Sequence, residues 1–332
     1  MNFCKLLLYN YSSVFGGQER YAEQLIENLP KKGFAVSFVG SPSILGEKTQ
    51  PIADQSNKNR VELLNGNRAL YKKALRFPKA AFWVYVQHSS VNDGQGSSWK
   101  RIVRKCLLWL LLNRVDLVVR VCDNALPEYY ASGKVKTIYN GVKLPEFTPF
   151  VPPQKNIKLL MVGGINSNKN QRLAIETLVH YKHATLTIVG SGEQQEYLEQ
   201  LAAYLGVAER VKWVGFVNNP ELYYKDADLL LLLSKFEAFP YVVLEAMSYS
   251  TPVIASPVGG VPEIIQHNKN GWLFNSNSSV VLATMINDIH RDNEHLELVG
   301  KEARETIEAK FTVDNMVSNL VDEINNRMEL SG

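Results

Sequence analysis

The sequence predicts an α/β protein built from two doubly wound, Rossmann-like domains, each on a parallel sheet. Three observations predict this fold. Short apolar runs of strand length alternate with helical patterns along both halves of the chain. Four of the 14 prolines fall between residues 145 and 153, where they interrupt regular structure. The length of 332 residues suits two domains, at about 150 residues each.

The proline cluster sets the predicted boundaries. We expect an N-terminal domain at residues 1–146, a stiff linker at 147–156, a C-terminal domain at 157–312 and a closing amphipathic helix at 313–332. Ligands of open α/β sheets bind outside the carboxyl ends of the strands. Functional residues are therefore expected in the loops that follow strands, around one cleft between two facing domains.

The strands are predicted from short runs rich in Val, Ile and Leu, which are typical of buried parallel strands. In the first half they lie at residues 5–9, 34–39, 81–86 and 117–121, with a helix before Gly33. In the second half they lie at 157–162, 185–189, 211–213, 229–233 and 252–255. Helices are predicted between them at 173–180, 194–205 and 242–248.

The composition excludes several classes of protein. Hydrophobic residues make up 45% and charged residues 21%, which excludes a disordered chain and leaves material for two cores. The three cysteines form no C-x-x-C pair and no disulfide framework, so a reducing cytosol is expected. No run approaches the roughly 20 apolar residues that span a bilayer. The N-terminus lacks the features of a signal peptide.

The most informative stretch follows the predicted strand at residues 229–233. It reads Ser234-Lys-Phe-Glu-Ala-Phe-Pro-Tyr-Val-Val-Leu-Glu-Ala-Met247. Pro240 suits the first turn of a helix, which places Glu237 in the loop and Glu245 on the helix. A helix N-terminus attracts anions. A carboxylate on each side of it could bind hydroxyls that flank a diphosphate, as in a sugar nucleotide.

Here the sequence resembles the retaining glycosyltransferases of family 4, which have the GT-B architecture. Their E-x7-E signature matches Glu237 and Glu245. Further blocks follow in the family's order at residues 16–19, 138–142, 188–192, 258–265 and 270–274. Together the blocks extend over most of the chain. The resemblance implies the GT-B fold, with two facing Rossmann-like domains and a cleft between them.

The resemblance also implies roles around the signature. Glu237 accepts hydrogen bonds from hydroxyls of the donor sugar, and Glu245 holds the ribose. Phe239 and Pro240 bring the helix N-terminus to the diphosphate. Ala238 stands where the family usually has Gly, and its methyl group is expected to tighten the sugar pocket.

Two glycine-containing loops complete the implied donor site. Lys169 matches the family's lysine, which stabilises the negative charge on the leaving diphosphate. Gly163, Gly164 and, on the next loop, Gly190 are assigned to donor binding. The family commonly has Arg where this chain has Gly164. Either another basic residue replaces that cation, or stabilisation of the leaving group is weaker.

Two features of the first half are assigned to the opposite side of the cleft. Gly16 and Gly17 match the family's first glycine loop. Glycine permits positive φ and a close backbone approach there. A plain strand-to-helix turn is the alternative. His88 follows the predicted strand at 81–86 and matches the cleft histidine of the family, near the reacting sugar and phosphate. We place it in the catalytic set with Glu237 and Lys169.

No metal site and no cofactor are expected. Asp226 and Asp228 have D-x-D spacing, but they precede an apolar strand and are assigned to a helix end. No protein nucleophile stands out, so the resemblance favours same-face attack, in which the departing phosphate helps to take the acceptor proton. The expected co-substrate is a nucleoside diphosphate sugar, with UDP slightly favoured over GDP.

The net charge of +3 hides an asymmetry. Residues 1–150 carry 21 Lys and Arg against 11 Asp and Glu, whereas residues 151–332 carry 15 against 22. Residues 98–114 combine basic residues with Trp99 and Trp109. A second basic stretch contains Arg60, Arg68, Lys72, Lys73, Arg76 and Lys79. A basic amphipathic helix with Trp can lie on an anionic membrane surface. The alternative is a domain helix with a solvated basic face. No nucleic-acid recognition module is found.

These observations predict a metal-independent, retaining glycosyltransferase of the EC 2.4 class. It would move a hexose or N-acetylhexosamine to a hydroxyl acceptor, expected to be a lipid-linked or envelope polysaccharide glycan. We expect it in the cytoplasm, free or peripheral on the inner face of the membrane. Two alternatives stay open. One is a sugar-nucleotide epimerase of similar fold. The other is a non-catalytic subunit that binds a sugar nucleotide at the membrane.

Overall fold

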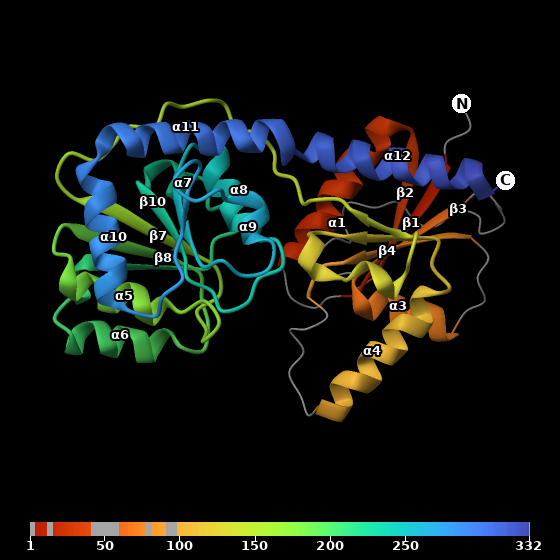
Figure 1. The fold of residues 1–332 in the computed structure, drawn as a ribbon, viewed down its shortest axis with the longest axis horizontal. Helices are drawn as coiled ribbons and strands as arrows, with labels where there is room; N and C mark the ends of the chain where they lie inside the picture. The colour runs from red at the N-terminus through yellow and green to blue at the C-terminus, as the bar shows by residue number, and fades with distance from the viewer. Residues whose placement is uncertain (1–3, 12–15, 41–59, 77–80, 91–97, 332) are drawn as a thin grey trace. The chain divides into compact units, whose positions relative to one another are not determined.

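The computed structural model describes residues 4–11, 16–40, 60–76, 81–90 and 98–331 (Figure 1). The chain divides into two compact units, residues 1–141 with 313–332, and residues 142–312. Each unit is a parallel α/β sheet covered by helices, as the sequence predicts. Residues 147–156, expected as the linker, contain no helix or strand and are part of the second unit.

The first unit has six parallel strands in the order β2-β1-β3-β4-β5-β6. They are β1 (Cys4–Asn10), β2 (Phe34–Gly40), β3 (Arg60–Asn65), β4 (Phe82–Gln87), β5 (Leu117–Arg120) and β6 (Val135–Thr137). Its helices include α1 (Gly17–Asn28), α3 (Asn67–Arg76), α4 (Ser98–Leu112) and α12 (Val313–Ser331). After β2 the chain returns to the other side of β1. The carboxyl ends of β1 and β3 therefore meet at the switch point, where open sheets bind ligands.

Strand β3 is absent from the sequence prediction, because two charged residues interrupt its apolar run. Glu62 is buried in the middle of the strand and forms ion pairs with Arg60, at 2.8 Å, and Lys73, at 2.9 Å. A buried carboxylate is tolerated where cations pair with it. One of these cations lies on α3, so the strand pattern alone gives no sign of it.

The second unit has six strands in the order β12-β11-β10-β7-β8-β9. They are β7 (Ile157–Val162), β8 (Ala184–Val189), β9 (Val211–Gly215), β10 (Leu229–Leu232), β11 (Val253–Ala255) and β12 (Trp272–Leu273). The four leucines of β10 are all buried, as expected for a central parallel strand. The order reverses between β7 and β10, which makes their carboxyl ends the switch point of this sheet.

Seven α-helices of the second unit are α5 (Gln171–His180), α6 (Gln195–Tyr204), α7 (Glu221–Asp226), α8 (Tyr241–Ser248), α9 (Val261–Ile264), α10 (Ser279–Arg291) and α11 (Asn293–Lys310). The sequence predicts α5, α6 and α8 at nearly these bounds. Helices α10 and α11 are not predicted, although each has an N-cap signal. Ser278 accepts a hydrogen bond from the Val281 N–H, and Asp292 accepts one from the His295 N–H.

Helix α12 follows α11 in sequence but is grouped with the first unit. Its apolar face, which includes Met316, Leu320 and Ile324, is buried. Asp314 pairs with Lys32 at 2.8 Å, and Arg327 donates a hydrogen bond to the Gly133 carbonyl. The terminal helix therefore belongs to the fold of the N-terminal domain. None of the helices in the described part of the chain is long and apolar enough to cross a membrane.

Candidate functional site

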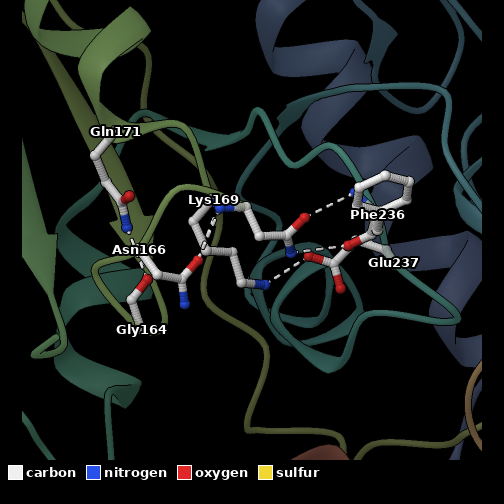
Figure 2. Close-up of polar contacts among 7 residues, drawn as sticks. Gly164, Asn166, Lys169, Gln171, Phe236 and Glu237 are labelled. Atoms are coloured by element: carbon white, nitrogen blue, oxygen red, sulfur yellow. Dashed lines mark hydrogen bonds and ion pairs between the residues drawn. The ribbon is translucent and has the colours of Figure 1, made fainter. Parts of the chain in front are cut away.

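The second unit brings Lys169 and Glu237 together. Lys169 lies in the loop after β7, and Glu237 lies in the loop after β10, at the switch point of the sheet. The Lys169 Nζ atom is 2.5 Å from the Glu237 Oε1 atom (Figure 2). Both side chains are mostly buried, at 20% and 13% exposure. The lysine and the first carboxylate predicted from sequence thus form one ion pair.

The two loops are joined by main-chain and side-chain hydrogen bonds from Asn168. Its amide binds both the N–H and the carbonyl of Phe236, and its carbonyl accepts from the Lys235 N–H. These bonds hold the two loops together at Asn168 and Phe236, the residues just before the two members of the ion pair. Sequence reasoning missed Asn168, because its partner lies 68 residues further along the chain.

The β7 loop is also fixed from within. The Asn166 carboxamide oxygen accepts hydrogen bonds from the N–H groups of Asn168 and Lys169. Gln171 donates a 2.9 Å hydrogen bond from Nε2 to the Gly164 carbonyl (Figure 2). Asn170 adopts a left-handed backbone conformation, with φ of 56°, immediately before α5. The lysine therefore projects from a tightly turned loop.

Gly190 is required by a close backbone approach. Its φ is +145°, and a Cβ atom there would lie 1.9 Å from the Gly163 carbonyl oxygen. Gly163 itself has φ of +137°. Gly164 is different, because a Cβ atom there would approach the Asn166 side chain at 3.1 Å and no backbone closer than 3.9 Å. The structure thus explains two of the three predicted glycines by sterics, and leaves room for a side chain at the third.

The loop that carries Glu237 is also anchored on its other side. Gly259 has φ of +55°, and a Cβ atom on it would lie 1.8 Å from the Glu237 carbonyl oxygen. The Gly260 N–H donates a 2.6 Å hydrogen bond to the Ala238 carbonyl. Phe239 is buried and packs edge-on against Phe311, with ring centroids 5.5 Å apart. These contacts hold the loop where α8 begins.

Helix α8 begins after Pro240, and no side chain caps it. Its N-terminus is the positive end of the helix dipole, which favours an anion. Glu245 lies further along α8, and its Oε2 atom accepts a 2.7 Å hydrogen bond from the Tyr224 hydroxyl. Tyr224 is buried and stacks on Tyr249 at 6.0 Å. Tyr224 therefore orients the second carboxylate, a role that sequence reasoning did not find.

Two buried polar atoms near these loops have no hydrogen-bond partner among the residues that the structure describes. One is the Ser234 hydroxyl, which comes shortly after β10, and the other is the Gln171 Oε1 atom. The Gln171 amide is oriented by its bond to the Gly164 carbonyl, so its oxygen is an unsatisfied acceptor. Unsatisfied buried polar atoms are rare in folded proteins and are a feature expected where a polar ligand binds.

In the first unit, His88 belongs to a chain of amides at the carboxyl ends of β1, β3 and β4. Its Nε2 atom is 2.5 Å from the Asn65 carboxamide oxygen, which accepts and so assigns the ring proton to Nε2. Asn65 donates to the Gln18 carbonyl, and Gln18 donates to Asn10. Burial lowers the pKa of His88 to about 3. The ring is therefore neutral at pH 7 and edge-on to Tyr21.

Gly16 is the N-cap of α1 and Gly17 is its first residue. Neither glycine has positive φ, and their assigned role in ligand binding stays a prediction. Gly16 is extended, and a Cβ atom on it would meet only the Glu19 carboxylate, at 3.5 Å. Glu19 belongs to the same sequence block. Its side chain is buried, and its Oε1 atom has no hydrogen-bond partner.

The D-x-D pair has a structural role. Asp226 ends α7 and pairs with Lys158 at 2.6 Å. Asp228 is buried, accepts a hydrogen bond from the Lys158 N–H, and has its pKa raised to about 6 by burial. In the described ranges, no three His, Cys, Asp or Glu side chains cluster as a metal site would require.

Comparison with known proteins finds similarity mainly over the second unit. Residues 145–306 match the model described as Glycosyl transferases group 1. An uncharacterized glycosyltransferase of Methanocaldococcus jannaschii is 33% identical over 218 residues, which cover 60% of this chain and 56% of that protein. The amylovoran biosynthesis glycosyltransferase AmsK of Erwinia amylovora is 29% identical over 167 residues, which cover 47% and 41%. The matches span about half the length of these curated relatives.

Solved structures share the whole fold. The crystal structure of HepE from Anabaena in complex with UDP and glucose superposes with a TM-score of 0.80 at 21% identity, and the match covers 97% of this chain and 100% of that chain. Sucrose-phosphate synthase from Thermosynechococcus elongatus also has a TM-score of 0.80, at 20% identity, with 99% and 100% covered. These likenesses show two parallel-sheet Rossmann-like domains of the GT-B type.

Proposed function

We propose, from the match of residues 145–306 to the glycosyl transferases group 1 model, that this chain is a retaining, metal-independent glycosyltransferase. It moves a hexose or N-acetylhexosamine from a nucleoside diphosphate sugar to a hydroxyl acceptor. The observation that carries the proposal is the Lys169–Glu237 ion pair, which lies at the switch point of the sheet and next to the start of α8.

The residues around this pair can bind the sugar, the diphosphate and the ribose of a nucleoside diphosphate sugar. Glu237 accepts hydrogen bonds from sugar hydroxyls, and Lys169 stabilises the charge that develops on the departing diphosphate. The uncapped N-terminus of α8 adds a second source of positive potential. Glu245, oriented by Tyr224, accepts hydrogen bonds from the ribose hydroxyls. The unsatisfied Ser234 hydroxyl and Gln171 oxygen offer further polar contacts.

The transfer proceeds on one face of the sugar. The bond between the anomeric carbon and the phosphate oxygen breaks, and the acceptor oxygen bonds to the anomeric carbon from the same side. The acceptor proton passes to the departing phosphate, so no separate general base is needed. His88 is neutral at working pH and acts as a hydrogen-bonding group near the reacting sugar. Positive charge for the diphosphate comes from Lys169 and the α8 dipole, which is why no metal is proposed.

The relatives support a choice of donor and acceptor. HepE was solved with UDP and with UDP-glucose, which favours UDP over GDP as the leaving group. AmsK is named for amylovoran biosynthesis, which favours an envelope polysaccharide or its lipid-linked precursor as the acceptor. We place the reaction in the cytoplasm at the inner face of the membrane, since the N-terminal half has the positive charge that anionic lipids attract.

The test is turnover of the wild type and of Glu237→Ala with a panel of nucleoside diphosphate sugars in EDTA, with and without a lipid-linked glycan acceptor. Release of nucleotide that depends on acceptor is expected for the wild type, and none for the variant at an unchanged melting temperature. Glu209→Ala, an exposed carboxylate on the same unit, is the matched control and should stay active.

Three outcomes would contradict the proposal. Normal turnover by Glu237→Ala would remove the assigned role of the carboxylate. Conversion of the donor sugar without any acceptor would favour the epimerase. Tight donor binding with no turnover by the wild type would favour the non-catalytic subunit, with Gly164 in place of the family's arginine as its cause.

A further inference from the structure

Helix α4 exposes an apolar stripe. The side chains of Leu108, Leu111 and Leu112 face the core and are buried. Opposite them, five large apolar side chains are about half exposed or more: Trp99 at 63%, Ile102 at 62%, Val103 at 54%, Trp109 at 48% and Leu110 at 56%. Their spacing of three and four residues places them along one side of the helix. Exposed Cys106 lies among them.

This stripe is unlike ordinary surface. Single exposed apolar residues are common, but a contiguous stripe of this kind marks an interaction site. The N-terminal half of α4 extends away from the sheet of its own unit (Figure 1). Trp99, Ile102 and Val103 lie on this half and are 54–63% exposed.

The charge of α4 indicates which kind of partner binds the stripe. Residues 98–112 contain four basic residues and no acidic one. Arg104 is exposed on this helix. Helical spacing places Arg104 on the side of α4 opposite the stripe, as in an amphipathic helix. An anionic surface with an apolar interior matches both properties. Tryptophan with basic residues on one helix is typical of helices that lie in a lipid interface.

The second basic stretch does not share this surface. Arg60 and Lys73 form buried ion pairs with Glu62. Lys72 lies over the Tyr11 ring, with Nζ 4.0 Å from its centroid. Lys79 is outside the described residues. Arg60 and Lys73 are therefore paired within the unit, whereas Arg68 is exposed. Of the two basic stretches, only α4 also has an exposed apolar stripe in the described residues.

We infer that α4 docks the chain on an anionic lipid bilayer. The apolar stripe enters the boundary between headgroups and acyl chains, to a depth of about 5–10 Å, and Arg104 and Lys105 bind the headgroups. The inference deepens the proposed peripheral location by naming the surface and its partner. It does not depend on the chemistry of the donor site.

The test is co-sedimentation of the full chain with vesicles of phosphatidylcholine alone, and with about 30% phosphatidylglycerol added. The wild type should bind the anionic vesicles. The double variant Trp99→Ala/Trp109→Ala should lose about tenfold or more in partition coefficient. The matched control is Tyr204→Ala/Leu222→Ala, which removes two exposed apolar side chains of the second unit and should bind as the wild type does. Melting curves of all variants establish that they are folded.

A charge variant tests the contribution of the basic residues to lipid binding. Arg104→Glu/Lys105→Glu should abolish the preference for phosphatidylglycerol and leave the melting temperature within a few degrees. Equal binding by the wild type and the Trp variant would overturn the inference. So would a concentration-dependent dimer, seen by sedimentation velocity, that the Trp variant breaks. A UDP-induced thermal shift, measured on each variant, reports separately on the donor site.

Discussion

Asn168 is hydrogen-bonded to the main chain of Phe236 at both of its polar groups. Its Oδ1 atom accepts from the Phe236 N–H at 2.9 Å, and its Nδ2 atom donates to the Phe236 carbonyl at 3.0 Å. The side chain thereby continues, beyond the ends of β7 and β10, the pairing that those strands make in the sheet. Lys169 follows Asn168 in sequence and Glu237 follows Phe236, so this pairing lies beside the ion pair.

Removing the Asn168 amide should loosen the ion pair without removing either charge. Asn168→Ala removes two solvent-exposed hydrogen bonds to Phe236, and water can replace the amide there, so we expect a loss of stability of about 1 kcal/mol. We expect kcat to fall about tenfold or more with a smaller change in KM, because misplaced charges act mainly on the transition state. Steady-state kinetics and urea denaturation measure the two effects.

A conservative variant at the same position sharpens this prediction. Asn168→Asp keeps the acceptor for the Phe236 N–H but loses the donor to its carbonyl, so its kcat should lie between those of the wild type and Asn168→Ala. Asn287→Ala, on the outer helix α10, is the control. Loss of stability with unchanged kcat in Asn168→Ala would show that the amide only supports the fold.

The Tyr224 hydroxyl should contribute to nucleotide affinity through Glu245. Tyr224→Phe removes the 2.7 Å hydrogen bond to the carboxylate and keeps the stacked ring. A hydrogen bond to a charged group is worth about 1.5 kcal/mol, so the Kd for the nucleotide should rise about tenfold. Titration calorimetry measures it, with Tyr223→Phe on the same helix as the control. Equal nucleotide affinities of the wild type, Tyr224→Phe and Tyr223→Phe would contradict the assignment of Glu245 to ribose binding.

Gly190 should tolerate no side chain. Gly190→Ala would place Cβ 1.9 Å from the Gly163 carbonyl oxygen, and one of the two backbones must move. Gly206→Ala is the matched control, because Gly206 also has positive φ but no atom lies within 4 Å of the added Cβ. We expect Gly206→Ala to cost about 1 kcal/mol and Gly190→Ala about 3 kcal/mol or more. Similar costs in urea denaturation would contradict the assigned clash.

His88 should make stability depend on pH in a defined direction. Its pKa is about 3 in the folded protein, against about 6.5 in an unfolded chain. The unfolded state therefore takes up the proton first, and the stability associated with neutral His88 is lost as pH falls from about 6.5 toward 3. The unfolding free energy of the wild type minus that of His88→Gln should fall by at most about 1.4 kcal/mol per pH unit in this range. A difference that stays constant over this range would contradict the lowered pKa of His88.

Much of the fold follows from local patterns. The runs at residues 157–162 and 229–233 are apolar on both faces of the sheet, and only buried parallel strands of an α/β domain combine such runs with intervening helices. The positions of Lys169 and Glu237 follow from the same pattern, since each lies in the loop that follows a strand. Their meeting requires β7 and β10 to be neighbours, which a reversal in strand order provides.

The remaining features depend on contacts that no local pattern contains. Glu62 breaks the apolar pattern of β3 because its partner Lys73 is on α3. Asn168 and Tyr224 look like ordinary polar residues until their partners on other elements are known. Gly16 has an extended backbone that does not itself require glycine, which the sequence alone does not show.

The measurement that tests the central claim most directly is the affinity for UDP in EDTA, by titration calorimetry, of the wild type and of Lys169→Met. The account predicts metal-independent binding by the wild type and affinity at least tenfold weaker in the variant, because Lys169 supplies positive charge to the diphosphate. Glu237→Gln should keep UDP affinity within a few-fold, since that carboxylate is assigned to the sugar. No binding of UDP by the folded wild type, or equal affinity of the wild type and Lys169→Met, would contradict the account.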